Sequence, residues 1–174
     1  MIPWEEVIQN ALSVVDFQLR KLQDDGEPYV VYLYGADGER ATDELVDRLM
    51  RNYPTHYADV LKRKGKTAQE LKDHVRGHFA YDCSGLVCAI TSSPWDMSSA
   101  GLYVQTKDAR TTPVNGLEAS LLWKPGHVGL DIGTGYLIEM VGEFDDLRVS
   151  WIRSRDFEVS GRLPWIDYTG ATNY

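Results

Sequence analysis

The order of hydrophobic patterns along the 174 residues constrains the fold most strongly. Residues 3–23 carry apolar side chains at helical spacing, and the charged stretch 41–78 continues with helix-forming segments. Three threonines are placed to cap these segments, namely Thr42, Thr55 and Thr67. From residue 118 onward the pattern changes to short alternating segments typical of strands. This order predicts an α+β fold with N-terminal helices packed on an antiparallel sheet.

Length and charge limit the organisation and the partners of the chain. Residues 1–174 are expected to form a single domain. The net charge of −8 argues against nucleic-acid binding, which depends on clustered lysine and arginine. No apolar run is long enough to span a membrane, and the N-terminus lacks the basic region of a secretory signal. We therefore expect synthesis in the cytoplasm without a signal peptide, and the oligomeric state is left open.

Both cysteines lie in the segment YDCSGLVCAI, at positions 81–90. Cys83 follows Asp82 and precedes Ser84 at the start of an apolar run that is predicted to be helical. Because the start of a helix favours negative charge, the pKa of Cys83 is expected to be lowered, and the thiol is a candidate nucleophile. The alternative is a packing cysteine with an incidental thiol. Cys88 lies inside the apolar run and is expected to be an inert buried residue, unable to bridge to Cys83.

The sequence carries little sign of a metal or cofactor. No cysteine and histidine cluster has zinc-ligand spacing. His74 and His78 are four residues apart in a helical pattern, and a solvated helix face explains them better than a metal site. We therefore expect no metal and no cofactor.

A histidine and a glutamate are placed to meet across a predicted hairpin. His127 opens a strand that turns at the glycines 133–135 and returns through Glu139. A three-residue loop with Gly135 in the left-handed region would pair Ile132 with Tyr136. Position 129, a glycine that leaves space, would then face Glu139, and the carboxylate would lie diagonal to His127. A two-residue loop would separate them, and an ordinary hairpin with a surface histidine is the alternative.

Three blocks of the sequence together resemble the NlpC family of papain-like cysteine peptidases, which cut peptidoglycan stem peptides. The blocks are PYVVYLYGA, YDCSGLV and GHVGLDIGTGYLIEM, in the family's order, and they cover less than a fifth of the chain. The resemblance implies a papain-like fold of NlpC type with the nucleophile at a helix N-terminus.

The resemblance also implies roles for individual residues. Cys83 attacks the amide carbonyl, His127 takes and returns the proton, and Glu139 stands where the family has its third polar residue. The other implied site residues are Tyr32, or alternatively Tyr34, beside the nucleophile, and Asp82 and Ser84 as substrate-binding groups. The oxyanion would be held by the Cys83 N–H and the Tyr32 hydroxyl.

The chain departs from the family pattern at two places. Between Gly35 and Asp82 it has a long charged segment instead of a short link, so residues 41–78 form an expected helical insertion that restricts the substrate. Asp131 stands where the family has an aromatic residue. We expect its side chain to be exposed, the alternative being that it binds a substrate amine.

The resemblance predicts a peptidoglycan endopeptidase that cuts near the D-glutamyl–diamino acid bond with a Cys-His-Glu triad. A phage lysin, a tail-associated wall hydrolase, a recycling enzyme and an exported toxin all fit a chain without a signal, and the amide between sugar and stem is another candidate bond. The alternatives are a non-catalytic phage tail module and a thiol acyltransferase or deamidating effector that acts on proteins.

Overall fold

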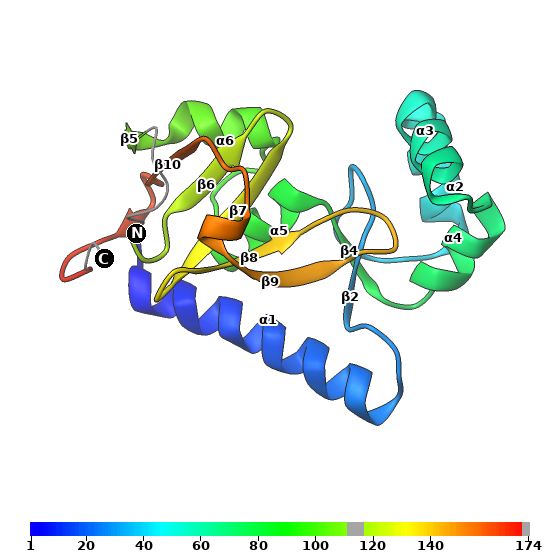
Figure 1. The fold of residues 1–174 in the computed structure, drawn as a ribbon, viewed down its shortest axis with the longest axis horizontal. Coiled ribbons are helices and arrows are strands. Elements are labelled where there is room, and N and C mark those ends of the chain that lie inside the picture. The colour runs from blue at the N-terminus through cyan, green and yellow to red at the C-terminus, as the bar shows by residue number, and fades with distance from the viewer. Residues whose placement is uncertain (111–116, 172–174) are drawn as a thin grey trace.

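The computed structural model describes residues 1–110 and 117–171, and it has the predicted α+β class (Figure 1). The helices are α1 (Trp4–Asp24), α2 (Asp43–Asn52), α3 (Pro54–Lys64), α4 (Ala68–Val75), α5 (Cys83–Ile90), α6 (Ser99–Gln105) and a short 3-10 helix, Ile152–Ser154. The strands are β1 (Ile2–Pro3), β2 (Val30–Tyr32), β3 (Asp37–Arg40), β4 (Phe79–Tyr81), β5 (Lys107–Arg110), β6 (Leu121–Lys124), β7 (His127–Gly133), β8 (Tyr136–Met140), β9 (Leu147–Trp151), β10 (Val159–Arg162) and β11 (Ile166–Asp167).

An antiparallel sheet of six strands lies at the centre, in the order β5-β10-β6-β7-β8-β9. The helix α1 runs along this sheet, and α5 also packs against it (Figure 1). These features confirm the predicted antiparallel sheet with an N-terminal helix packed on it. A smaller sheet has the order β2-β4-β3, and its β2–β4 pair is parallel, which the sequence did not predict.

The long helix α1 confirms the helix predicted over residues 3–23 and also positions the strand β2. Gln18 is buried on the inner side of α1, where an unpaired amide would be costly. Its Oε1 accepts hydrogen bonds from the backbone N–H groups of Tyr29 and Val30 at 2.7 Å and 2.9 Å. The helix thereby fixes the start of the strand that leads to Tyr32.

The stretch 41–78 is helical as predicted, and α2, α3 and α4 lie together at one end of the molecule (Figure 1). Their apolar side chains form a core cluster that is distinct from the cluster between the central sheet, α1 and α5. The buried members of this cluster are Val31, Leu33, Ala36, Ala41, Leu45, Val46, Leu49, Tyr57, Val60, Leu61, Leu71, Val75 and Ala80. Since strands β2 and β4 contribute to it, the helices are anchored to the small sheet.

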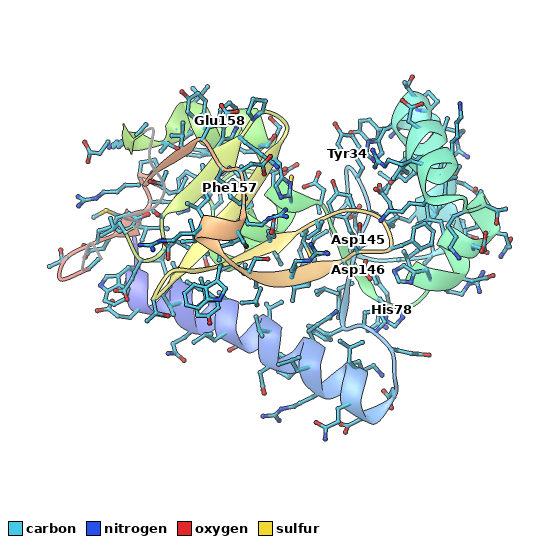
Figure 2. The ribbon with its side chains drawn as sticks, viewed as in Figure 1. Tyr34, His78, Asp145, Asp146, Phe157 and Glu158 are labelled. Carbon is cyan, nitrogen blue, oxygen red and sulfur yellow. The ribbon has the colours of Figure 1, made fainter. Side chains whose placement is uncertain are left out.

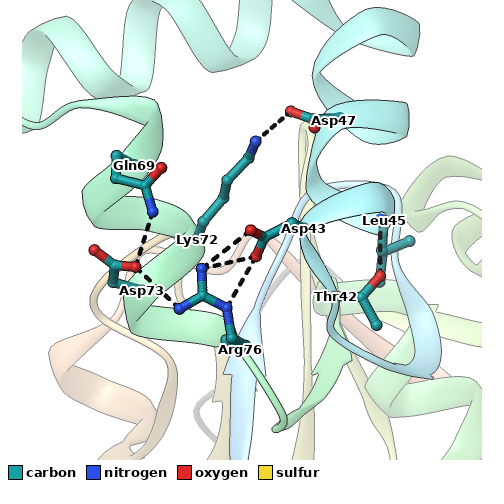
Figure 3. A network of polar contacts seen from close by, with 8 residues as sticks. All are labelled: Thr42, Asp43, Leu45, Asp47, Gln69, Lys72, Asp73 and Arg76. Atoms are coloured by element: carbon teal, nitrogen blue, oxygen red, sulfur yellow. Dashed lines mark hydrogen bonds and ion pairs between the residues drawn. The ribbon is translucent and has the colours of Figure 1, made fainter.

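The caps of these helices follow the local sequence at two of the three predicted threonines. Thr42 caps α2 by accepting a hydrogen bond from a first-turn N–H at 3.2 Å (Figure 3). Thr67 forms a capping box with Glu70 at the start of α4. The prediction for Thr55 is wrong, because α3 already begins at Pro54. Proline suits the first helical position, where its missing N–H costs nothing.

Ion pairs join α4 to α2 across the surface of this helical stretch. The Arg76 guanidinium lies 2.9 Å from Asp43, and the Lys72 amine lies 2.7 Å from Asp47 (Figure 3). Pairs as exposed as these contribute at most about 1 kcal/mol each. The apolar cluster therefore contributes more to holding the three helices together.

The stretch that follows α5 is rich in turn-forming residues, yet it contains regular elements. Ser98 caps the helix α6, and β5 follows it. Residues 111–116 lie outside the described part of the chain.

Candidate active site

Cys83 is the first residue of α5, and Asp82 is the N-cap of that helix. One carboxylate oxygen of Asp82 accepts hydrogen bonds from the Gly85 N–H at 2.8 Å and from the Ser84 hydroxyl at 2.9 Å. The other oxygen accepts a hydrogen bond from the Gly35 N–H at 3.2 Å. Asp82 therefore ties the start of the nucleophile helix to the turn between β2 and β3.

The Cys83 thiol is buried, with 7% of the residue exposed. Burial, and next the Asp82 carboxylate, raise the pKa of the Cys83 thiol to about 11, although the N–H groups of Val128 and Ser84 act in the opposite direction. The expected lowering of this pKa is therefore wrong, because loss of solvent outweighs the donors at the helix start. Cys88 is also buried, and both thiols are free.

His127 and Glu139 meet across β7 and β8, as the sequence predicted. The His127 Nε2 lies 2.8 Å from a Glu139 carboxylate oxygen, and the imidazole is stacked on Phe157 with ring centroids 5.7 Å apart. Arg155 completes the group from the segment after β9. Its Nε lies 2.7 Å from one oxygen of Glu139, and its Nη2 donates to the other at 3.0 Å. The imidazole is thus held by the Glu139 carboxylate and by the Phe157 ring, and Arg155 holds the carboxylate.

Glu139 is a buried anion that contacts His127, Arg155 and, at 3.5 Å, the Ser150 hydroxyl. Only 1% of the residue is exposed, and burial alone would raise the pKa of its carboxyl. The hydrogen bonds from His127 and Arg155 outweigh burial and leave the pKa of Glu139 below its usual value. A carboxylate in this position stabilises a protonated imidazole.

The β7–β8 turn differs from the predicted one but leads to the same register. Thr134 and Gly135 form a two-residue turn in the left-handed region, and Gly133 pairs with Tyr136. The predicted pairing of Ile132 with Tyr136 is wrong. A bulge between positions 131 and 133 adds one residue to β7, so Leu130 pairs with Ile138. Continued by one residue, this register places position 129 opposite Glu139, as predicted.

Two details near this hairpin were predicted wrongly. A Cβ on Gly129 would meet Leu137 and Phe157 within 3.2 Å, so aromatic and aliphatic side chains fill the space that was expected to be open. Asp131 was expected to be exposed and is instead fully buried. Its carboxylate accepts a hydrogen bond from the Gly133 N–H at 2.8 Å, which explains its burial at the bulge.

A cleft of about 240 Å³ opens over the nucleophile. Cys83, Asp82 and Ser84 line it, and so does Gly126, which directly precedes His127. The other lining residues are Tyr34, Gly35, Ala36, Asp37, Tyr53, Asp96, Met97, Ser98 and Ser99. All the charged side chains in this lining are acidic, so the cleft favours a cationic ligand group.

The two candidate tyrosines occupy different positions. Tyr32 is buried, and burial raises the pKa of its hydroxyl well above the usual range, with Cys83 and Glu143 as the next contributors. Tyr32 pairs with Tyr81, two residues before Cys83, and belongs to the same core cluster as Cys83, so its side chain lies near the thiol. Tyr34 is partly exposed and lines the cleft, facing the helices α2–α4 (Figure 2).

The start of β7 brings His127 to the same region as the thiol. The Val128 N–H lowers the pKa of Cys83 through a hydrogen bond, so the two elements are in contact. No hydrogen bond joins Cys83 to the imidazole of His127 in the described structure. Since Nε2 is taken by Glu139, Nδ1 is the ring nitrogen that remains for a proton from the thiol.

Sequence reasoning missed two residues at this site. Arg155 lies sixteen residues after Glu139 and belongs to no motif, so only the tertiary fold reveals it. Tyr53 enters the cleft from the helical stretch. The glycine at position 35 is a sequence signal for this contact, because the Tyr53 ring occupies the space that a Cβ would need and the backbone there has a φ of +81°.

No family model matches the chain, and no curated protein matches it.

The described residues contain no helix that is long and apolar enough to cross a membrane. They also contain no group of three or more histidine, cysteine or acidic side chains that could hold a metal ion. His74 and His78 were predicted to lie on one helix. This prediction is wrong, because α4 ends at Val75 and His78 lies beyond it. His74 is instead hydrogen-bonded to Asp146 at 2.8 Å.

Proposed function

We propose that this protein is a cysteine peptidase with a papain-like fold of NlpC type. In this proposal Cys83 is the nucleophile, His127 is the general base and Glu139 orients the imidazole. The observation that carries it is the hydrogen-bonded series His127–Glu139–Arg155, which begins next to a cleft with a cysteine at a helix start. The three sequence blocks that resemble the family support the same assignment.

The chemistry follows from the protonation states at the site. With a pKa of about 11, the Cys83 thiol is protonated at neutral pH, so its proton must leave as the sulfur attacks. The free Nδ1 of His127 takes this proton, and the Glu139 carboxylate stabilises the imidazolium. The sulfur bonds to the amide carbon, and the Cys83 N–H and the Tyr32 hydroxyl hold the oxyanion. The imidazolium then protonates the leaving amine, and water hydrolyses the thioester to a carboxylic acid.

The proposed substrate is the stem peptide of peptidoglycan, cut near the D-glutamyl–diamino acid bond. The acidic side chains Asp37, Asp82 and Asp96 in the cleft support a substrate that carries an ammonium group. Tyr53 narrows the cleft from the helical stretch 41–78, which supports a role for this stretch in restricting the substrate.

The test is digestion of purified peptidoglycan of the diaminopimelate and lysine types, with products identified by mass spectrometry. The proposal predicts new termini at one bond with the wild type and with Cys88→Ala, and none with Cys83→Ala. A folded wild type that releases no product from either wall type would contradict it.

One observation favours a second candidate, a non-catalytic structural module. The Cys83 thiol is buried, has a raised pKa and has no hydrogen bond to His127 in the described structure. A thiol probe at neutral pH separates the two candidates. Labelling of native Cys83 that slows in His127→Ala would indicate a nucleophile assisted by its base, and labelling unchanged by this substitution would indicate the structural module.

A further inference from the structure

The loop between β8 and β9 reaches from the central sheet to the helices α2–α4. Figure 2 shows Asp145 and Asp146 at the end of this loop, on the side that faces these helices. Phe144 and Asp146 adopt left-handed backbone conformations, with φ of +69° and +52°. Residues other than glycine rarely adopt this backbone conformation unless their surroundings hold them in it. The contacts of the loop side chains hold these backbone conformations in place.

Glu143 connects this loop to Tyr34 and to a histidine of α3. Its side chain is 2% exposed, and one carboxylate oxygen accepts a hydrogen bond from the Tyr34 N–H at 3.3 Å. The same oxygen lies 2.9 Å from the Nε2 of His56. The His56 ring is in turn stacked on the Tyr34 ring, with centroids 4.1 Å apart and planes at 20°. Glu143 thus touches both the backbone of Tyr34 and the ring that supports its side chain.

Asp146 makes the equivalent connection two residues earlier in the chain, at Tyr32. One carboxylate oxygen accepts a hydrogen bond from the Tyr32 N–H at 2.8 Å. The other oxygen lies 2.8 Å from the Nε2 of His74 on α4. Two carboxylates of one loop therefore hold alternate residues of the segment that passes Cys83, and each carboxylate is held by a histidine of the helical stretch.

The other contacts of Tyr34 make its position a defined one. The Tyr57 hydroxyl donates a hydrogen bond to the Tyr34 carbonyl at 2.9 Å. The ring of Tyr53 meets the ring of Tyr34 edge-on, with centroids 5.0 Å apart. Both the amide and the carbonyl of Tyr34 are therefore bonded to side chains, although its ring lines an open cleft.

We propose that Glu143 and Asp146 are positioning residues that hold Tyr34 and Tyr32 beside the Cys83 thiol. His56 and His74 hold the two carboxylates, so the helical stretch contributes to the cleft through this loop as well as through Tyr53. The assignment of these residues to catalysis rests on the proposed function, but their effect on the thiol does not. Removing either carboxylate leaves the N–H of Tyr32 or Tyr34 without its hydrogen-bond partner, and the segment that carries these tyrosines then opens to solvent more often.

The experiment compares Glu143→Ala and Asp146→Ala with Glu143→Gln, which keeps the acceptor oxygen. Asp145→Asn is the matched control, because the side chain of this neighbour in the same loop pairs with Lys64 at the surface and, among the described residues, with no other ion. The first readout is amide hydrogen exchange at Tyr32 and Tyr34. The second is the pH profile of Cys83 alkylation by iodoacetamide, followed by peptide mass spectrometry.

We expect about tenfold faster exchange at Tyr34 in Glu143→Ala and at Tyr32 in Asp146→Ala, the effect of one lost hydrogen bond to a charged group. We also expect the Cys83 alkylation profile to move to lower pH, because an opened wall returns solvent to the thiol. Glu143→Gln and the Asp145→Asn control should keep wild-type behaviour. Wild-type exchange and an unmoved alkylation profile in the alanine variants would overturn the proposal.

Two further measurements keep the outcome decisive. If an alanine variant does not fold, His56→Leu replaces Glu143→Ala and His74→Leu replaces Asp146→Ala. Each histidine is partly exposed, and its loss should move the same readouts in the same direction. If the wild type cuts the wall, Glu143→Ala should mainly raise KM and Asp146→Ala should mainly lower kcat, because Tyr34 lines the cleft and Tyr32 lies near the thiol. If the wild type cuts nothing, the proposed function fails while exchange and alkylation still test the positioning.

Discussion

Replacing Arg155 with methionine tests the polar group behind the imidazole. Both oxygens of Glu139 contact the guanidinium, and the Glu139 side chain has no exposed surface. Removing one partner of a buried ion pair costs 3–5 kcal/mol, and Arg155 is 22% exposed, so the lower end applies, about 3 kcal/mol. For a chain of this length that corresponds to a fall in Tm of about 6–12 °C. Urea unfolding at pH 7 measures the loss in the free energy of unfolding, and the exposed Arg153→Met serves as the control.

The effect of Arg155→Met should also depend on pH in one direction. The pKa of Glu139 is lowered in the folded protein, so its contribution to stability is present above the unfolded pKa and is lost as the pH falls through the folded pKa. The destabilisation should therefore be largest at neutral pH and shrink toward acid. A loss below about 1 kcal/mol at pH 7, or a loss that grows toward acid, would refute the reasoning that the ion pair anchors Glu139.

Three further predictions follow from other contacts. Gly85→Ala should destabilise the fold by about 1–2 kcal/mol in urea unfolding, because a Cβ would lie 2.9 Å from the Ala36 carbonyl oxygen; an unchanged midpoint would show that the backbone yields. The hydrogen bond with Asp146 raises the pKa of His74, so this histidine stabilises the fold below its unfolded pKa and loses that effect as the pH rises through the folded pKa. His74→Gln should accordingly cost more stability at pH 5.5 than at pH 8.5, and equal losses would contradict this. Tyr53→Ala should widen the range of wall fragments cut, as read by mass spectrometry, and an unchanged product set would exclude Tyr53 from selection.

Local sequence signals were sufficient where the structure depends on near neighbours. The helix start at Cys83 and the caps at Thr42 and Thr67 involve residues within a few positions of one another. The His127–Glu139 contact was also predicted, but for an incomplete reason. The turn has two residues rather than three, and the bulge near Ile132 restores the register that the prediction assumed.

The remaining features depend on tertiary burial, which a single sequence does not display. The pKa of Cys83 is raised first by burial, which the residues around the helix start do not reveal. The packing of Phe157 over Gly129 and the contact of Arg155 with Glu139 join segments that share no local pattern. Asp131 was predicted to be exposed, whereas its backbone partner, the Gly133 N–H at the bulge, lies inside the protein.

Acid quenching during turnover on a peptidoglycan fragment, followed by peptide mass spectrometry, tests the central claim most directly. The account predicts a stem-peptide acyl group on Cys83 as a hydroxylamine-sensitive thioester, and no such adduct in His127→Ala. Product release by Cys83→Ala, or an adduct on Cys88 in its place, would contradict the assignment of Cys83 as the nucleophile.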